Sequence, residues 1–276
     1  MSLKRFLADI DGNIATLDTI LSGDYALNVI THPHDDFYLR VARQDFSNFS
    51  SLFIFARSVT VTATESVIWS GGTPFTFLTQ AEPLSIVSTS ENDTLLGTGA
   101  RTLYLDGLNN NYEVQTEIIA LTGQTPVIST LAYLRLCSAI VMTSGTNSPV
   151  SDTNLGTITL TTTSTKKVQG SIVINQGQAL TSVCTVPAGK TGYITGVSFS
   201  AGQGKQCLFR AKIRNGVGAL YAFSVKYAID LYQNTFQGDL KIPMRIPEKT
   251  DMCITGVTSS GTIDACASYG IFLIDN

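Results

Sequence analysis

The run that decides the fold class is GTGARTLYLDGLNNNYEVQTEIIALTG, from Gly97 to Gly123. An asparagine turn, Asn109–Asn111, lies at its centre, and apolar or β-branched residues alternate with polar ones on both sides of that turn. A period of two residues is typical of a strand that buries one face. The run therefore predicts an antiparallel β-hairpin.

Two glycine runs resemble nucleotide-binding loops. A dinucleotide loop needs a third glycine and a following helix, but Thr102 stands where that glycine would follow Gly97-Thr98-Gly99, and a strand pattern comes next. The run Gly189-Lys190-Thr191 ends like a phosphate-binding loop, but Cys184 occupies the position of its first glycine. Both runs are expected to form turns.

The composition limits the classes of partner. The chain has 276 residues with a net charge of −3, and only 14% are charged, against about 25% in typical soluble proteins. It carries no basic stripe for nucleic acid and no long apolar segment for a membrane. Neither partner is expected.

The five cysteines are odd in number and widely spaced, without a C-x-x-C pair: Cys137, Cys184, Cys207, Cys253 and Cys266. Several lie where their neighbours alternate as in a strand, so we expect free, buried thiols. Free thiols indicate folding in a reducing cytoplasm.

Residues 1–23 carry a helical signal. Their apolar residues recur at alternating spacings of four and three, like the a and d positions of a coiled coil: Leu3, Leu7, Ile10, Ile14, Leu17 and Leu21. The spacing predicts a short helix that contacts a partner or copies of itself, or else packs on its own domain. The following residues up to 60 are rich in aromatics without alternation and are expected to form an extended arm.

Alternation begins at Ser58–Trp69 and continues nearly to the end, with turn signals between the runs. The polar stretch Thr161–Gly170 divides two such series. We therefore expect an all-β protein with an N-terminal helix and arm (1–60), an Ig-like sandwich (61–165) and a jelly-roll sandwich (166–276). In the second series, the pattern places on one face the residues Tyr193, Thr195, Val197 and Phe199, then Cys207, Phe209, Ala211 and Ile213, then Ile263, Ala265, Ala267, Tyr269, Ile271 and Leu273.

Candidate chemical sites are few. The segment HPHDD holds the two histidines, His32 and His34, beside Asp35 and Asp36, and could bind a metal, although a polar turn is favoured. The hairpin turn residues Asn109, Asn110, Asn111 and Tyr112 form a candidate glycan patch, against an ordinary solvated turn. No nucleophile elbow or catalytic triad spacing occurs. We expect no enzyme, no cofactor and no essential metal.

Several segments together resemble a family of β-rich virion proteins from tailed phages of cyanobacteria and other aquatic bacteria. The segments occur in one order, beginning with DFYLRVARQDFSNFSSLFIFARS, ESVIWSGG and the hairpin run, and ending with VPAGKTGYITGVSFSAGQGK and LYQNTFQGDLKIPMRIPEKTDMCI. The resemblance implies a virion structural protein, assembled in the host cytoplasm, without fixing its place in the particle.

Three functions remain open at this stage. The first is a capsid decoration or cement protein, a trimer that binds other virion proteins such as the major capsid protein. The second is a head or tail fibre-type adhesin that binds a host surface glycan. The third is a metal-dependent enzyme built on HPHDD.

Overall fold

The structure is a computed structural model that describes residues 6–8, 14–19, 25–28, 37–72, 74–146, 153–202, 205–216 and 222–276. The chain divides into two compact units, Met1–Ser47 and Asn48–Asn276. Regular structure in the described residues is almost entirely β-strand, with one short helix, α1 (Phe37–Ala42). The expected all-β class is confirmed. No helix in the described part of the chain has the length and apolarity needed to cross a membrane.

The N-terminal unit contains a three-stranded antiparallel sheet where a helix was expected. Its strands are β1 (Phe6–Ala8), β2 (Ile14–Thr19) and β3 (Tyr25–Asn28), in that order. The register pairs Leu7 with Ala15 and Leu17 with Leu27. The predicted helix over residues 1–23 is therefore wrong.

The sequence contains a physical reason for this difference. Asp11-Gly12 stands between the first two strands and Gly23-Asp24 between the second and third, and both Asp-Gly and Gly-Asp favour hairpin connections. Of the expected helical seam, Leu7, Ile14 and Leu17 lie in strands, whereas Leu3, Ile10 and Leu21 lie outside the described residues. The segment HPHDD, residues 32–36, also lies outside them.

The second half of the expected arm is a long strand, β4 (Phe49–Val61), which pairs with the last strand, β19 (Ile263–Asp275). Ile54 lies opposite Tyr269, and Ala56, which is fully buried, lies opposite Ala267. Phe53 and Phe55 alternate with these residues, so both faces of β4 are apolar. That is why the sequence shows no polar alternation here.

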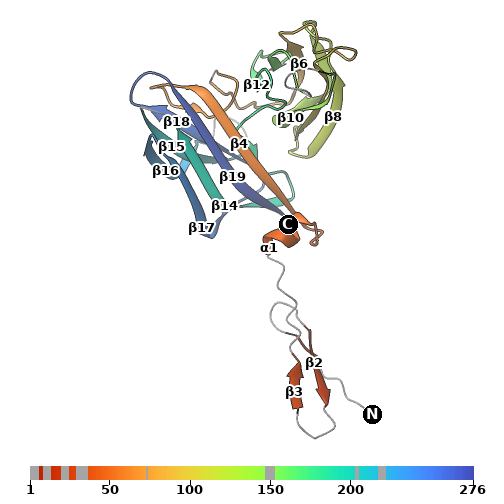
Figure 1. The fold of residues 1–276 in the computed structure, drawn as a ribbon, viewed down its shortest axis with the longest axis vertical. Coiled ribbons are helices and arrows are strands. Elements are labelled where there is room, and N and C mark those ends of the chain that lie inside the picture. The colour runs from red at the N-terminus through yellow and green to blue at the C-terminus, as the bar shows by residue number, and fades with distance from the viewer. Residues whose placement is uncertain are drawn as a thin grey trace. The chain divides into compact units, whose positions relative to one another are not determined.

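We call the sandwich that β4 joins the body (Figure 1). One of its sheets has the order β17-β14-β19-β4, and the other has the order β13-β18-β15-β16 with β5 also paired to β18. The strands not yet bounded are β5 (Ser66–Val67), β13 (Cys184–Thr185), β14 (Lys190–Ala201), β15 (Gln206–Asn215), β16 (Ser224–Tyr232), β17 (Thr235–Ile246) and β18 (Thr250–Thr258). Side chains from both sheets form one apolar core that includes Phe199, Phe209, Ile254 and Tyr269.

The expected faces hold for two of the three strands examined. Cys207, Phe209 and Ala211 are buried, as are the alternate residues of β19 from Ile263 to Leu273. In β14 the register shifts between Ile194 and Gly196. Because this bulge inverts the alternation, Ile194 is buried in the core, and the expectation for Tyr193 and Thr195 is wrong.

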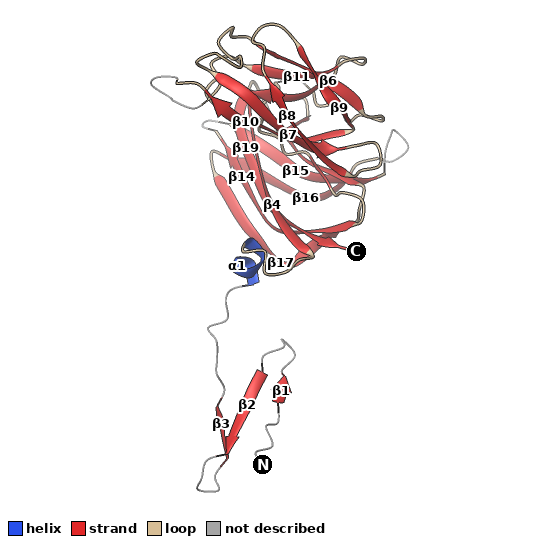
Figure 2. Ribbon diagram, turned by 90° about the vertical axis from the view of Figure 1, so that its right-hand side faces the viewer, coloured by secondary structure: helices blue, strands red, loops and turns tan. Residues whose placement is uncertain are grey.

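The chain between β5 and β13 forms a second sandwich, which we call the insert. Figure 2 labels six of its strands, β6 to β11. Its sheets have the orders β10-β7-β8 and β12-β11-β6-β9. Its strands are β6 (Glu82–Ser88), β7 (Ala100–Leu108), β8 (Val114–Ala120), β9 (Val127–Tyr133), β10 (Arg135–Ser144), β11 (Ile158–Thr162) and β12 (Val168–Ile172). Strands β7 and β8 pair as the predicted hairpin, with Leu108 opposite Val114.

The insert does not have the strand order expected of an Ig-like domain. In the immunoglobulin fold the first, second, fifth and fourth strands share one sheet. Here the first strand, β6, pairs with β11 and β9, whereas β7 pairs with β10 and β8. The shared feature is limited to two packed antiparallel sheets.

The boundary expected near residue 165 falls inside a hairpin. Strands β11 and β12, on either side of Thr163–Lys167, pair with each other, Ile158 opposite Ile172. The polar run Thr161–Gly170 is thus a turn and its flanks, with Lys166 at a positive φ of 56°. The body instead consists of two chain pieces, because β4 and β5 precede the insert and β13 to β19 follow it.

All five cysteines are free, as expected. Burial raises the pKa of Cys184 and of Cys253 to about 12, and that of Cys207 to about 11. These thiols stay protonated near neutral pH, so they behave as small apolar core residues rather than nucleophiles.

Candidate functional site: the junction and groove between the two sandwiches

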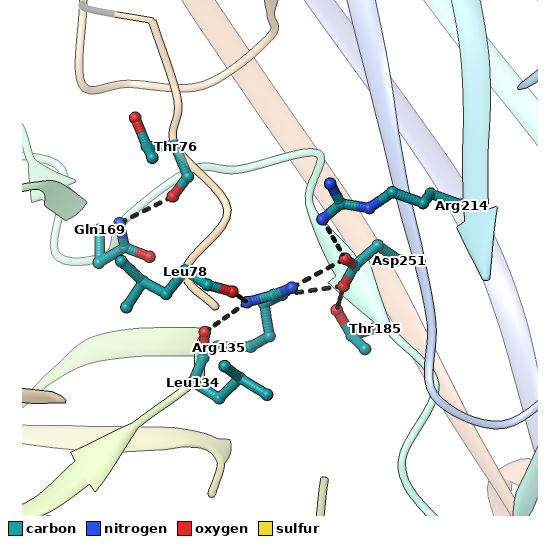
Figure 3. A network of polar contacts seen from close by, with 8 residues as sticks. All are labelled: Thr76, Leu78, Leu134, Arg135, Gln169, Thr185, Arg214 and Asp251. Carbon is teal, nitrogen blue, oxygen red and sulfur yellow. Dashed lines mark hydrogen bonds and ion pairs between the residues drawn. The ribbon is translucent and has the colours of Figure 1, made fainter. Parts of the chain in front are cut away.

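A buried ion pair joins the insert to the body (Figure 3). Arg135, the first residue of β10, donates from Nε to Oδ1 of Asp251 at 2.8 Å and from Nη2 to Oδ2 at 2.8 Å. Its Nη1 donates to the carbonyl oxygens of Leu78 and Leu134, at 2.8 and 2.7 Å. The two side chains are 1% and 0% exposed. Every guanidinium nitrogen therefore has a partner, and four of its five N–H groups donate a hydrogen bond, which offsets the cost of burying the charge.

The carboxylate of Asp251, on β18, has two further partners. Arg214 Nη2 donates to Oδ2 at 2.6 Å, and Thr185 Oγ1 donates to Oδ1 at 2.7 Å. Burial alone would raise the pKa of Asp251, but the hydrogen bonds and charges of Arg135 and Arg214, with the Thr185 hydroxyl, outweigh it and lower the pKa. Asp251 is therefore ionised in the folded protein at neutral pH.

Aromatic rings cover the two arginines from two parts of the chain: Phe77 lies in the segment that leads from β5 into the insert, and Phe223 directly precedes β16. The Phe77 centroid lies 5.2 Å from Arg135 Cζ and 4.9 Å from Arg214 Cζ, and Phe223 lies 4.6 Å from Arg214 Cζ. Phe75 packs edge-on against both Phe77 and Trp69. Cations over aromatic faces are further stabilised where water is excluded.

The asparagine turn of the hairpin docks at the same junction. Tyr112 is 4% exposed and has a positive φ of 67°, and its carbonyl accepts a hydrogen bond from the Ala188 amide of the body at 2.9 Å. Asn109 Oδ1 accepts from the Asn111 and Glu113 amides, and Asn110 Oδ1 accepts from the Ala81 amide.

These contacts remove the expected glycan patch. Tyr112 cannot offer an aromatic face to a sugar, because it packs with Leu78, Leu108 and Leu134. Asn109 and Asn110 use their side-chain oxygens within the turn and its neighbour. The turn is a docking element between the two sandwiches.

A groove of about 780 Å³ runs beside the junction, between β4 and the outward face of the β10-β7-β8 sheet. Apolar residues line both walls: Leu52, Phe53 and Phe55 from β4, and Tyr104, Val114 and Ile140 from the insert. Leu52, Phe53, Phe55, Val114 and Ile140 are exposed. The volume is within the roughly 300–1,000 Å³ of ligand-binding clefts.

One wall of the groove is a sheet edge. Strand β4 is the last in the order β17-β14-β19-β4, and from Phe49 to Ala56 it contains neither a charged residue nor a proline. Natural edge strands usually carry lysine, proline or a bulge that prevents pairing with another chain. This edge lacks the first two devices over its apolar half, which favours pairing with a further strand.

No cluster of metal-binding side chains accompanies the groove in the described residues. In the described ranges, no three His, Cys, Asp or Glu side chains lie close enough together to hold a metal ion. The sequence interpretation missed Arg135, Asp251 and Arg214. For Asp251 the sequence does contain a signal, because this charged residue directly precedes the mostly apolar run MCITGV.

Comparisons with known proteins find little. No family model matches the sequence, and no curated protein matches it. Among solved structures, infectious bursal disease virus of the Gt strain aligns with a TM-score of 0.24 and 11% identity over 83% of this chain and 73% of that one. The Gx strain aligns with a TM-score of 0.21 and 10% identity over 83% of this chain and 70% of that one. Likenesses this slight carry no argument about fold or function.

Proposed function

We propose that this protein is a structural component of a virus particle, and most specifically a decoration or cement protein of the phage head. The observation that carries the proposal is the apolar edge of β4, which is open to pairing and lies beside an apolar groove. Such a surface suits a protein whose work is assembly. The sequence resemblance to phage virion proteins supports the same assignment.

We further propose that the body is a jelly roll interrupted by the insert. The strand order supports this, if β5 and β13 are counted as two halves of the second strand because both pair with β18. Counted in this way, the sheet β17-β14-β19-β4 has the order sixth, third, eighth and first strand. The sheet β13-β18-β15-β16 has the order second, seventh, fourth and fifth strand. That order is typical of jelly rolls, which recur in viral capsid and lectin domains.

The occupant that we propose for the groove is an extended strand of a second copy of this chain, within a homotrimer. Backbone pairing along β4 would supply affinity, and the apolar walls would receive alternate side chains of the added strand. The neutral, unprotected edge favours a like chain over a charged partner, and closed symmetric assemblies cover such edges. The N-terminal sheet is a second proposed contact, since three strands of three to six residues are marginal without a partner.

We expect Leu52→Lys to dissociate this assembly while leaving the monomer folded. Leu52 lines the groove and is 42% exposed, so lysine can reach water in the monomer but not in a filled groove. Losing one buried leucine costs about 1.5–3 kcal/mol per interface, or roughly 10- to 100-fold in affinity. Light scattering and incorporation into particles measure the effect.

Ile242→Lys is the matched control, because Ile242 is 85% exposed on β17, the opposite edge of the same sheet. It should assemble like the unmodified chain. A monomeric wild-type protein, or a Leu52→Lys variant that still associates, would refute the groove as the contact.

The alternative function is a head or tail fibre-type adhesin that binds a host glycan. It shares the jelly-roll proposal, since that fold also occurs in lectins. The copy number in the particle separates the two roles.

A further inference from the structure

Figure 1 shows the strands β17, β14, β19 and β4, which form one sheet. The outward face of this sheet carries an unusual row of residues. Phe53 on β4 lies opposite Gly270 on β19, Gly270 lies opposite Gly196 on β14, and Gly196 lies opposite Asp239 on β17. An aromatic ring and a carboxylate thus stand at the two ends of a row whose centre consists of two glycines. A trough of about 380 Å³ occupies this position.

The two glycines leave bare backbone as the floor of the trough, and polar atoms lie over it. A Cβ atom placed on Gly196 would be 3.0 Å from Asp239 Oδ1, and one on Gly270 would be 3.5 Å from Thr195 Oγ1. Thr195 is the residue at which the β14 register shifts. The bulge therefore supplies a hydroxyl group to the trough where regular alternation would not.

A second row of polar side chains lines the same trough. Ser198 lies opposite both Ser268 and Gln237, two residue pairs along from the glycines and therefore on the same face of the sheet. In the described part of the chain, neither these three side chains nor Asp239 makes a hydrogen bond or ion pair with another group. Their donors and acceptors are all available to a ligand.

We propose that this trough binds a neutral carbohydrate. Phe53, 74% exposed, offers an apolar ring to the C–H face of a sugar. The Asp239 carboxylate accepts hydrogen bonds from hydroxyl groups, and the Gln237 amide and the serine hydroxyls both donate and accept. The glycine floor lets a flat ring approach the backbone, as glycine does at other sites of close ligand approach.

The charge of the trough selects among sugars. Among the described residues, Asp239 is the one charged side chain that lines it, and no lysine, arginine or histidine does so. An anionic sugar such as a uronic or sialic acid would meet an uncompensated carboxylate, whereas a neutral hexose would not. The inference does not depend on the particle assignment. Phe53 lines the groove as well as the trough, so a strand added along β4 and a sugar in the trough would contact the same ring. The trough would provide the adhesin alternative with a binding site.

The test uses the full-length chain on an array of neutral and anionic oligosaccharides, followed by saturation-transfer NMR with maltotriose, cellotriose and the trimer of N-acetylglucosamine. We expect binding to neutral hexose glycans. Phe53→Ala and Asp239→Ala should each weaken it at least tenfold without changing the melting temperature. The controls Val59→Ala and Asp230→Ala, an exposed apolar residue and an exposed carboxylate outside the trough, should bind like the wild type.

A third variant tests the glycine floor. Gly270→Ala adds one methyl group at an ordinary contact distance from its neighbours, so the fold should tolerate it while sugar affinity falls. The proposal fails if no neutral glycan binds at millimolar concentration, if anionic glycans are preferred, or if binding is unchanged in both Phe53→Ala and Asp239→Ala.

Discussion

Asp251→Asn is expected to destabilise the folded chain by about 3–5 kcal/mol, because it leaves two buried guanidinium groups without their counter-charge. Arg135 would keep its carbonyl partners but lose the ionic partner that it contacts with two nitrogens. Since Arg135 belongs to the insert and Asp251 to the body, the loss should appear at the junction between them. Denaturant unfolding and hydrogen exchange at β10 and β18 measure it.

Asp264→Asn is the matched control. Asp264 also pairs with an arginine, Arg57, but the two side chains are 41% and 48% exposed. Exposed pairs are worth about 0–1 kcal/mol, so this variant should be nearly as stable as the wild type. Equal effects of the two substitutions would show that the junction pair does not hold the sandwiches together.

The same pair gives the chain a pH dependence of known sign. The folded-state pKa of Asp251 lies below its ordinary value of 3.8. A group whose pKa is depressed on folding adds stability above the unfolded-state pKa and loses it as the pH falls through the folded one. The difference in stability between wild type and Asp251→Asn should therefore shrink as the pH falls below about 4.

Asp93→Ala is expected to unfold the insert selectively. The Asp93 side chain is fully buried and accepts four hydrogen bonds, from the Ser88 hydroxyl at 2.6 Å and from the amides of Ala100, Leu155 and Gly156 at 2.8 Å each. Removing the carboxylate leaves three amide donors without a hydrogen-bond partner, and each such donor lowers the stability by about 1–3 kcal/mol. We expect a total loss of about 3–5 kcal/mol, at the upper end for single substitutions.

Hydrogen exchange locates the Asp93 effect, because amides of β6, β7 and β11 should lose protection before those of β14 and β19. Glu91→Ala is the control, since Glu91 is exposed in the same loop. Uniform loss of protection across both sandwiches would mean that the insert does not unfold separately. A stability within about 0.5 kcal/mol of the wild type would contradict the role given to Asp93.

Alternation along a single strand predicted the buried residues correctly where one face of the strand packs in the core and the other faces solvent. The strands around Phe209 and Tyr269 show this, with inward residues buried as predicted. The same reasoning failed at β14, because a single extra residue near Thr195 inverts the alternation. It also failed at β4, where both faces are apolar and no period of two appears.

Chain topology could not be read from local pattern. The run Thr161–Gly170 has the composition of a linker, but Ile158 and Ile172 pair across it. Nothing local reveals that β5 and β13, separated by the whole insert, both pair with β18. The N-terminal apolar spacing suited a helix as well as short strands, and Asp11-Gly12 was the better guide.

The candidate sites needed three dimensions. Tyr112 lies in a polar turn, which suggested exposure, but a tertiary contact with Ala188 buries it. The row Phe53, Gly270, Gly196, Asp239 joins residues far apart in the chain. Only the sheet register brings them together.

The most direct test of the central proposal is the copy number of this chain in purified particles, measured by quantitative mass spectrometry against the major capsid protein. A decoration protein that covers the head is expected at hundreds of copies per particle. A few copies to some tens would instead favour the fibre-type adhesin. Absence from purified particles would contradict a structural role in the virion.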